Sequence, residues 1–289
     1  MQFIGLDDIF RSISAMRELE QTGQTRRTPT FYRPFHFVLL ALTVQRCGWP
    51  EFHMTDGDAK FTAYAARMHL WDALGLQPPV SVNKYDATGR FHPLTRLDDP
   101  DAVEDVSCKL SQLFGGDRSE NVRSIDIAVS ELVGNSYAHS NIGTGLRGFV
   151  CAQKWSGGEK AQIAIGDCGI GVRRSLTSSI EYKDIPSSVN ACEMATMYEV
   201  TSKRGNGHSG YGLTLAKQLI ENNGGAFFLV SDDEYYMSRA GHSQSGRLPD
   251  RLPGTIVIME WNTNVSLSAK QVYDSWPSPL EEDEYDFDF

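Results

Sequence analysis

The stretch Ser130-Glu131-Leu132-Val133-Gly134-Asn135-Ser136-Tyr137-Ala138-His139 lies at the centre of the sequence pattern that decides the fold. Glu131, Asn135 and His139 follow one another at intervals of four residues, so they share one face of the expected helix. A carboxylate and a carboxamide one turn apart can hold a magnesium ion through oxygen ligands, although polar residues at this spacing often form only a solvated face. The opposite face is expected to be buried because apolar residues recur there at helical spacing, namely Val122, Ile125, Val129, Leu132 and Val133.

The composition is that of an ordinary globular chain with an acidic balance. The 289 residues suffice for two domains, and the apolar and charged fractions of 40% and 22% are normal. The formal net charge of −10 disfavours nucleic acid as a partner. No apolar run is long enough to span a membrane, and no secretory signal pattern opens the chain. The cysteines are scattered without a C-x-x-C pair, which favours a cytoplasmic location over a disulfide or zinc framework.

Shifts in sequence character divide the chain into three parts. Residues 1–100 predict a small α/β module for sensing or docking, in which the apolar run Phe35–Val44 fits either a helix or a strand. Residues 101–265 carry the motifs that are informative about chemistry. Residues 266–289 end in an acidic sequence and predict a flexible tail.

Two glycine-containing motifs follow the central helix. An expected strand, Gln162 to Gly166, runs into Asp167-Cys168-Gly169-Ile170-Gly171, which sets a carboxylate beside backbone that a planar ring can approach. A simple turn is the alternative interpretation of that motif. The long segment Ser175–Arg204 then predicts a lid. Several glycines between residues 205 and 212 precede an expected helix, Leu213–Asn222, and free N–H groups at such a helix start form a ready phosphate site.

The last part of this region predicts antiparallel strands. The alternating pattern places them at Ala226–Ser231, Glu234–Arg239 and Thr255–Asn262. The polar segment between Ala240 and Pro253 predicts a mobile loop between the last two strands.

Gly205, Gly207 and Gly210 also spell G-x-G-x-x-G, the pattern of dinucleotide-binding folds. That pattern requires a strand directly before the first glycine, whereas Ala191–Val200 predicts a helix. No G-x-x-x-x-G-K-[ST] sequence occurs in the chain either. The dinucleotide fold and the ordinary P-loop are therefore disfavoured.

Taken in order, the motifs resemble those of the GHKL ATPase superfamily, whose members share the Bergerat nucleotide-binding fold. The resemblance covers about residues 102–262. It implies an α+β fold, with an α/β sandwich of a mixed, mostly antiparallel sheet and helices on one face, preceded by the N-terminal module. The motifs that carry it are Glu131-x-x-x-Asn135, Asp167-x-Gly169-x-Gly171, the lid, Gly210-x-Gly212 before a helix, and Gly254-Thr255 at the start of a strand.

The resemblance implies ATP and Mg²⁺ as ligands. Asn135 would coordinate the magnesium that bridges the phosphates, and Glu131 would polarise an attacking water or a substrate hydroxyl. Asp167 would accept the adenine amino group, and Thr255 would hold a bridging water. The other implied binding residues are Gly169 and Gly171 beneath the base, Gly210, Tyr211 and Gly212 around the phosphates, Lys203 and His208 as phosphate contacts, and His139.

The helix motif is most similar to those of anti-sigma-factor serine kinases and of histidine-kinase-like ATP-binding regulatory proteins of bacteria. The similarity implies a cytoplasmic, bacterial regulator that hydrolyses ATP or transfers a phosphoryl group to a protein partner. The alternative is a non-catalytic module whose lid switches a partner surface when nucleotide binds. The identity of the partner, the reaction and the oligomeric state, including a homodimer, stay open.

Overall fold

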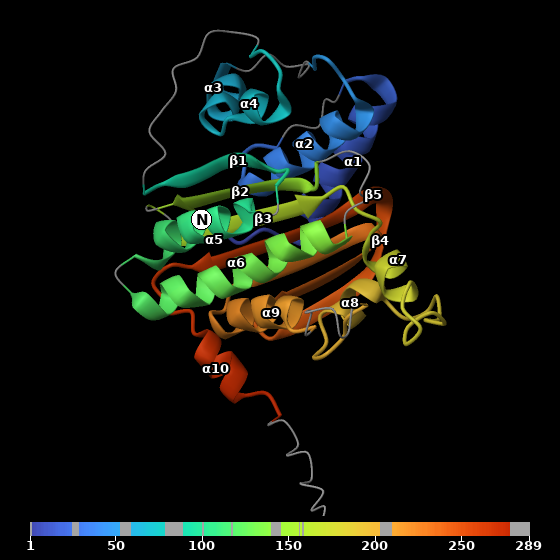
Figure 1. Cartoon of the computed structure of the whole chain (residues 1–289). Coiled ribbons are helices and arrows are strands. Elements are labelled where there is room, and N and C mark those ends of the chain that lie inside the picture. Colours follow the sequence, from blue (N-terminus) through green and yellow to red (C-terminus); the bar gives the residue numbers. More distant parts are fainter. Residues whose placement is uncertain are drawn as a thin grey trace, which may run out of the picture.

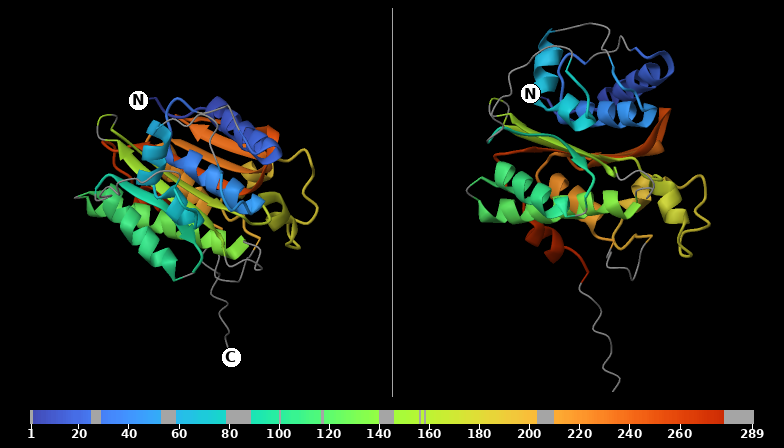
Figure 2. Two further views of the ribbon diagram at one scale, coloured as in Figure 1. Left: turned by 90° about the horizontal axis from the view of Figure 1, so that it is seen from above. Right: turned by 45° about the horizontal axis from the view of Figure 1, so that its top comes forward.

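The computed structural model describes residues 2–24, 29–52, 59–78, 89–99, 101–116, 118–139, 146–155, 157, 159–202 and 210–277. Within these ranges a five-stranded sheet lies between two layers of helices (Figure 1 and Figure 2). The elements are α1 (Leu6–Thr22), α2 (Pro34–Cys47), α3 (Ala59–Arg67), α4 (Leu70–Leu74), β1 (Phe91–Leu97), α5 (Ala102–Gly115), α6 (Ser119–His139), β2 (Gly148–Trp155), β3 (Lys160–Asp167), α7 (Val172–Thr177), α8 (Ala191–Ala195), α9 (Gly212–Asn222), β4 (Ala226–Arg239), β5 (His242–Asn262) and α10 (Ala269–Asp274).

The sheet has the strand order β1-β2-β3-β5-β4, and each neighbouring pair is antiparallel. Successive side chains of a strand point to opposite faces, so the sheet serves two apolar cores. On β5, Ile256 and Ile258 belong to one buried cluster, while Val257 and Met259 belong to the other. The structure thus confirms an α+β chain built on an antiparallel sheet. Helices cover both faces of that sheet, whereas the sequence predicted helices on one.

The helix α2 accounts for the second layer. Its residues from Phe35 to Val44 are buried except for His36, which is half-buried, as expected of a helix without a broad polar face. Pro34 stands in its first turn, and Gly48 ends it at a φ of 63°. The helix packs on β2 and β3, with α1 and α4 against it. The apolar run that fitted either a helix or a strand is therefore a helix. The strand β1, also from residues 1–100, belongs to the main sheet.

The strands β4 and β5 form one long hairpin, so the prediction of a mobile loop over residues 240–253 is wrong. They stay paired up to the turn, where Ala240 and Gly241 have positive φ angles of 49° and 79°. Two positive φ angles suit a two-residue hairpin. The polar sequence was misleading because distant segments hold the outer half of the hairpin: the Ser245 hydroxyl, for example, donates to Glu193 at 2.6 Å.

The other face of the sheet carries α5, α6 and α9, which lie below it in Figure 1. The apolar face predicted for α6 is confirmed for Ile125, Val129, Leu132 and Val133, which are all buried, whereas Val122 is half-buried. Across the described ranges, no helix combines the length and the apolar character that crossing a bilayer requires.

Candidate functional site

A cavity of about 100 Å³ lies where α6, α7 and α9 meet the sheet. Residues singled out from the sequence line it from separate elements: Asn135 from α6, Asp167 from the end of β3, Gly171 from the following turn and Thr255 from β5. Asp167 and Thr255 come together because they are directly opposed in the β3–β5 pairing. Residues spread over more than a hundred positions of the chain therefore share one cavity.

The remaining walls of this cavity are mostly apolar. Ile165 and Val257 lie two positions from Asp167 and Thr255, so they share the same face of the sheet. These walls were not predicted from the sequence, although the two-residue period of a strand was a usable signal for Ile165 and Val257. The helices and the segment after α8 add Leu132, Val172, Leu176, Ala195, Val200 and Leu213.

The carboxyl group of Asp167 is the titratable group of the cavity. Burial raises its pKa to about 7, because the charged form loses water. Hydrogen bonds act in the opposite direction: the Gly169 N–H donates to Oδ1 at 2.7 Å, and Thr255 donates as well. Near neutral pH the group is therefore poised between a carboxylate that accepts hydrogen bonds and a carboxylic acid that also donates one.

Glu131 lies at the edge of this site, beside the start of α9, and is exposed. A Cβ added to Gly212 would lie 2.9 Å from its Oε2 atom. The first N–H groups of a helix have no partner within the helix and carry a partial positive charge. The arrangement thus sets a carboxylate next to a helix end that attracts anions.

Gly171 and Gly210 both adopt backbone conformations that favour glycine. Their φ angles are 84° and 78°. A Cβ on Gly171 would lie 2.7 Å from the Asp232 carboxylate, and one on Gly210 would lie 3.0 Å from the carbonyl carbon of Glu199. At these two expected binding positions, the local packing therefore also requires glycine.

Four other residues expected at the site need separate mention. Tyr211 precedes α9, but its ring stacks on Tyr198, with ring centroids 5.0 Å apart, and it does not line the cavity. Lys203 and His208 lie outside the described residues, as does the side chain of His139.

The oxygen donors of α6 fit a magnesium ion. Asn135 and Glu131 offer an amide oxygen and a carboxylate from neighbouring turns of the helix. Proteins commonly hold Mg²⁺ through one or two such oxygens, with water and substrate phosphates as the other ligands. No group of three or more His, Cys, Asp or Glu side chains suited to a metal occurs among the described residues, so this fit depends on phosphate ligands.

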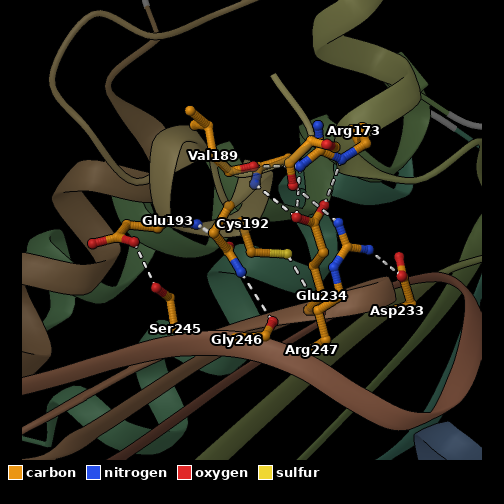
Figure 3. A network of polar contacts seen from close by, with 12 residues as sticks. Arg173, Val189, Cys192, Glu193, Asp233, Glu234, Ser245, Gly246 and Arg247 are labelled. Atoms are coloured by element: carbon orange, nitrogen blue, oxygen red, sulfur yellow. Dashed lines mark hydrogen bonds and ion pairs between the residues drawn. The ribbon is translucent and has the colours of Figure 1, made fainter. Parts of the chain in front are cut away.

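A polar network fixes the wall of the cavity that α7 and α8 provide (Figure 3). Arg173 of α7 donates two hydrogen bonds to the carboxylate of Glu234 on β4, at 2.8 Å and 2.7 Å. The same carboxylate accepts the N–H of Ala191 at 3.2 Å. The Asn190 amide donates to the carbonyl of Gly246 at 2.9 Å. The middle of the expected lid, at Asn190 and Ala191, is thereby attached to the β4–β5 hairpin, which the sequence did not predict.

The chain matches no protein-family model. Comparison with curated proteins gives no match either. The geometry of the cavity and the order of the motifs are therefore the observations that bear on function.

Proposed function

We propose that this chain binds ATP with Mg²⁺ in the cavity between α6, α9 and the sheet. We further propose that it hydrolyses ATP or transfers the γ-phosphoryl group to a protein partner. The meeting of Asn135, Asp167 and Thr255 around one cavity is the observation that carries the proposal. The antiparallel sheet, with α6 and α9 on one face, supports a Bergerat-type fold for residues 101–265.

The cavity offers the chemistry that an adenine ring needs. Its walls are largely apolar, and Asp167 would accept the hydrogen bond of the exocyclic amino group. Thr255 stands beside that carboxylate and would hold a bridging water. With a volume of about 100 Å³ the cavity suits one planar ring, so the phosphates would lie outside it, toward the start of α9.

The triphosphate would be held where Glu131 meets Gly212. The free N–H groups of the α9 N-terminus would donate to phosphate oxygens. Asn135 would ligate the Mg²⁺, which when bound neutralises the negative charge of the phosphates. Glu131 would accept a proton from the attacking water or from a hydroxyl of the partner. Its exposure on the helix surface leaves room for either nucleophile.

Magnesium-dependent release of ADP, measured beside ATP affinity, tests this function. We expect the wild-type chain to turn over, and Glu131→Ala to lose about a hundredfold or more in rate. The same variant should keep its ATP affinity within about threefold, because the base contributes to the reaction and not to ground-state binding. If the wild-type chain neither binds ATP nor releases ADP, the proposal is wrong.

The Glu131→Ala variant also separates hydrolysis from a nucleotide-gated module. A chain that binds ATP without turnover, and whose variant still switches a partner on addition of ATP, would be such a module.

A further inference from the structure

A second cavity, of about 350 Å³, lies between α1, α2 and residues 29–33. It occupies the opposite side of the sheet from the proposed nucleotide site, since Ile4, Phe35 and Leu39 of its lining belong to the other apolar cluster. Protein interiors rarely leave voids larger than a water molecule. A volume of this size instead falls within the range of small-molecule sites, roughly 300–1,000 Å³.

Aromatic side chains form part of the wall and the mouth of this second cavity. Phe31, Tyr32 and Phe35 all line it. Phe31 does so while 48% of its surface stays exposed, so part of its ring is available to a ligand. A flat ring entering the cavity would cover Phe31 and replace its contact with water by an apolar one.

His36 provides a hydrogen-bond donor to the cavity. Its Nδ1 atom accepts the backbone N–H of Arg33 at 2.9 Å. Burial lowers the pKa of His36 to about 3, so the ring is neutral at physiological pH and its proton is on Nε2. Within the described part of the chain, this Nε2–H has no acceptor.

The charged groups around the cavity also leave donors unused. The Arg33 guanidinium is paired with the buried carboxylate of Glu260. Arg11 uses its Nη2 atom for Asp8, at 2.9 Å, and its Nε atom for a backbone carbonyl, so among the described residues its Nη1 atom is left for a ligand. Asp8 already accepts on both oxygens, from Arg11 and from the Gly5 N–H. A ligand that brings hydrogen-bond acceptors would therefore use the donors that remain on Arg11 and His36.

We propose that the cavity between α1 and α2 binds a small aromatic carboxylate. Its ring packs against Phe31 and Tyr32, and its carboxylate accepts hydrogen bonds from His36 and Arg11. The site is separate from the nucleotide cavity and its existence does not depend on the proposed ATP chemistry. It gives the N-terminal layer the function of recognising a small metabolite.

Titration of the full chain with phenylacetate, followed by calorimetry or ligand-observed NMR, tests this site. We expect a dissociation constant of about 1 mM or tighter, because the probe is small. Phenethylamine has a similar shape and the opposite charge, so it should bind at least about tenfold more weakly. Absence of phenylacetate binding, or equal binding of the amine, overturns the proposal.

Three variants test whether phenylacetate binds in the cavity between α1 and α2. Arg11→Gln changes an exposed side chain and should weaken phenylacetate by about tenfold. Arg247→Gln, at another exposed arginine that is paired with an aspartate, should leave the affinity unchanged. Ala15→Phe places a ring in the cavity and should abolish binding; should it fail to fold, Arg11→Gln decides. Full affinity of Arg11→Gln for phenylacetate contradicts the site.

The Asp167→Asn variant separates this site from the nucleotide cavity. It should bind phenylacetate as the wild-type chain does, whatever happens to ATP. If Asp167→Asn abolishes phenylacetate binding, the probe occupies the nucleotide cavity and the proposal is wrong.

Discussion

Glu131 on α6 and Gly212 at the start of α9 approach so closely that a Cβ on Gly212 would lie 2.9 Å from the Cβ of Glu131. Any larger residue at this position must displace the carboxylate, the helix start or both. Because Gly212 has no side chain, the proposed phosphate site at the start of α9 can lie directly beside the proposed base, Glu131. This relation connects two motifs that lie about eighty residues apart in the sequence.

The Gly212→Ala substitution should therefore disturb nucleotide chemistry. We expect it to lower ATP affinity or turnover by about tenfold or more, since displacements of this size at a site are costly. Gly134→Ala, on α6, is the matched control, because a Cβ there meets nothing within 4 Å. That control should keep full activity and gain about 0.5–1 kcal/mol of stability. Wild-type activity of Gly212→Ala would show that the contact does not matter.

The raised pKa of Asp167 leads to a pH-dependent stability. Its pKa in the folded chain, about 7, lies above the ordinary value of 3.8, so folding favours the protonated group. The stability that protonation provides is fully present below about pH 4 and is lost as the pH rises through 7. We expect Asp167→Asn to remove this dependence and to be about 1–3 kcal/mol more stable than the wild-type chain at about pH 8.

Urea unfolding of both chains across this pH range measures the effect. Stability curves for the wild-type chain and Asp167→Asn that run parallel between pH 4 and 8 would contradict it.

The ion pair of Arg173 and Glu234 should be important for stability. The Glu234 side chain is 3% exposed, so Arg173→Met would leave a buried carboxylate without its partner. We expect a loss of about 3 kcal/mol in the free energy of unfolding. Arg247→Met breaks a pair whose side chains are 51% and 46% exposed, and should cost no more than about 1 kcal/mol. Equal losses of stability for the two variants would show that the Arg173–Glu234 pair contributes no more than an exposed ion pair.

Gly166, which precedes Asp167 on β3, packs closely against α2, and this contact gives a further prediction. A Cβ on Gly166 would lie 2.7 Å from Val38 and 2.8 Å from Leu42, so Gly166→Ala should destabilise the chain by about 1–3 kcal/mol. Val38→Ala removes part of the obstacle, and the double variant should be more stable than the sum of the two losses implies. Strict additivity in thermal unfolding would exclude this contact as the cause.

The sequence allowed some of these features to be predicted. The spacing of Ile125, Val129 and Leu132 defines a helix period, and the structure has that helix with that face buried. The motifs around Asp167 and Thr255 indicated residues that the structure brings together in one cavity. Local patterns sufficed here because each signal lies within or beside a single helix or strand.

Other features depend on contacts that a local pattern does not contain. The run Phe35–Val44 is apolar apart from His36 and Thr43, so it shows no clear period and its sequence does not distinguish a helix from a strand. Residues 240–253 are polar and mostly exposed or half-buried, and their hairpin meets α1 and α8 through hydrogen bonds between segments far apart in the sequence. The cavity between α1 and α2 likewise has no signature along the chain, since its donors come from separate elements.

Calorimetric titration of ATP with Mg²⁺ into the wild-type chain and into Asp167→Asn tests the nucleotide proposal most directly. We expect saturable binding to the wild-type chain and an affinity about 10–100-fold lower for the variant, because an amide presents a donor where the adenine amino group needs an acceptor. Equal affinities for the two chains, or no binding to the wild-type chain, would contradict the proposed site.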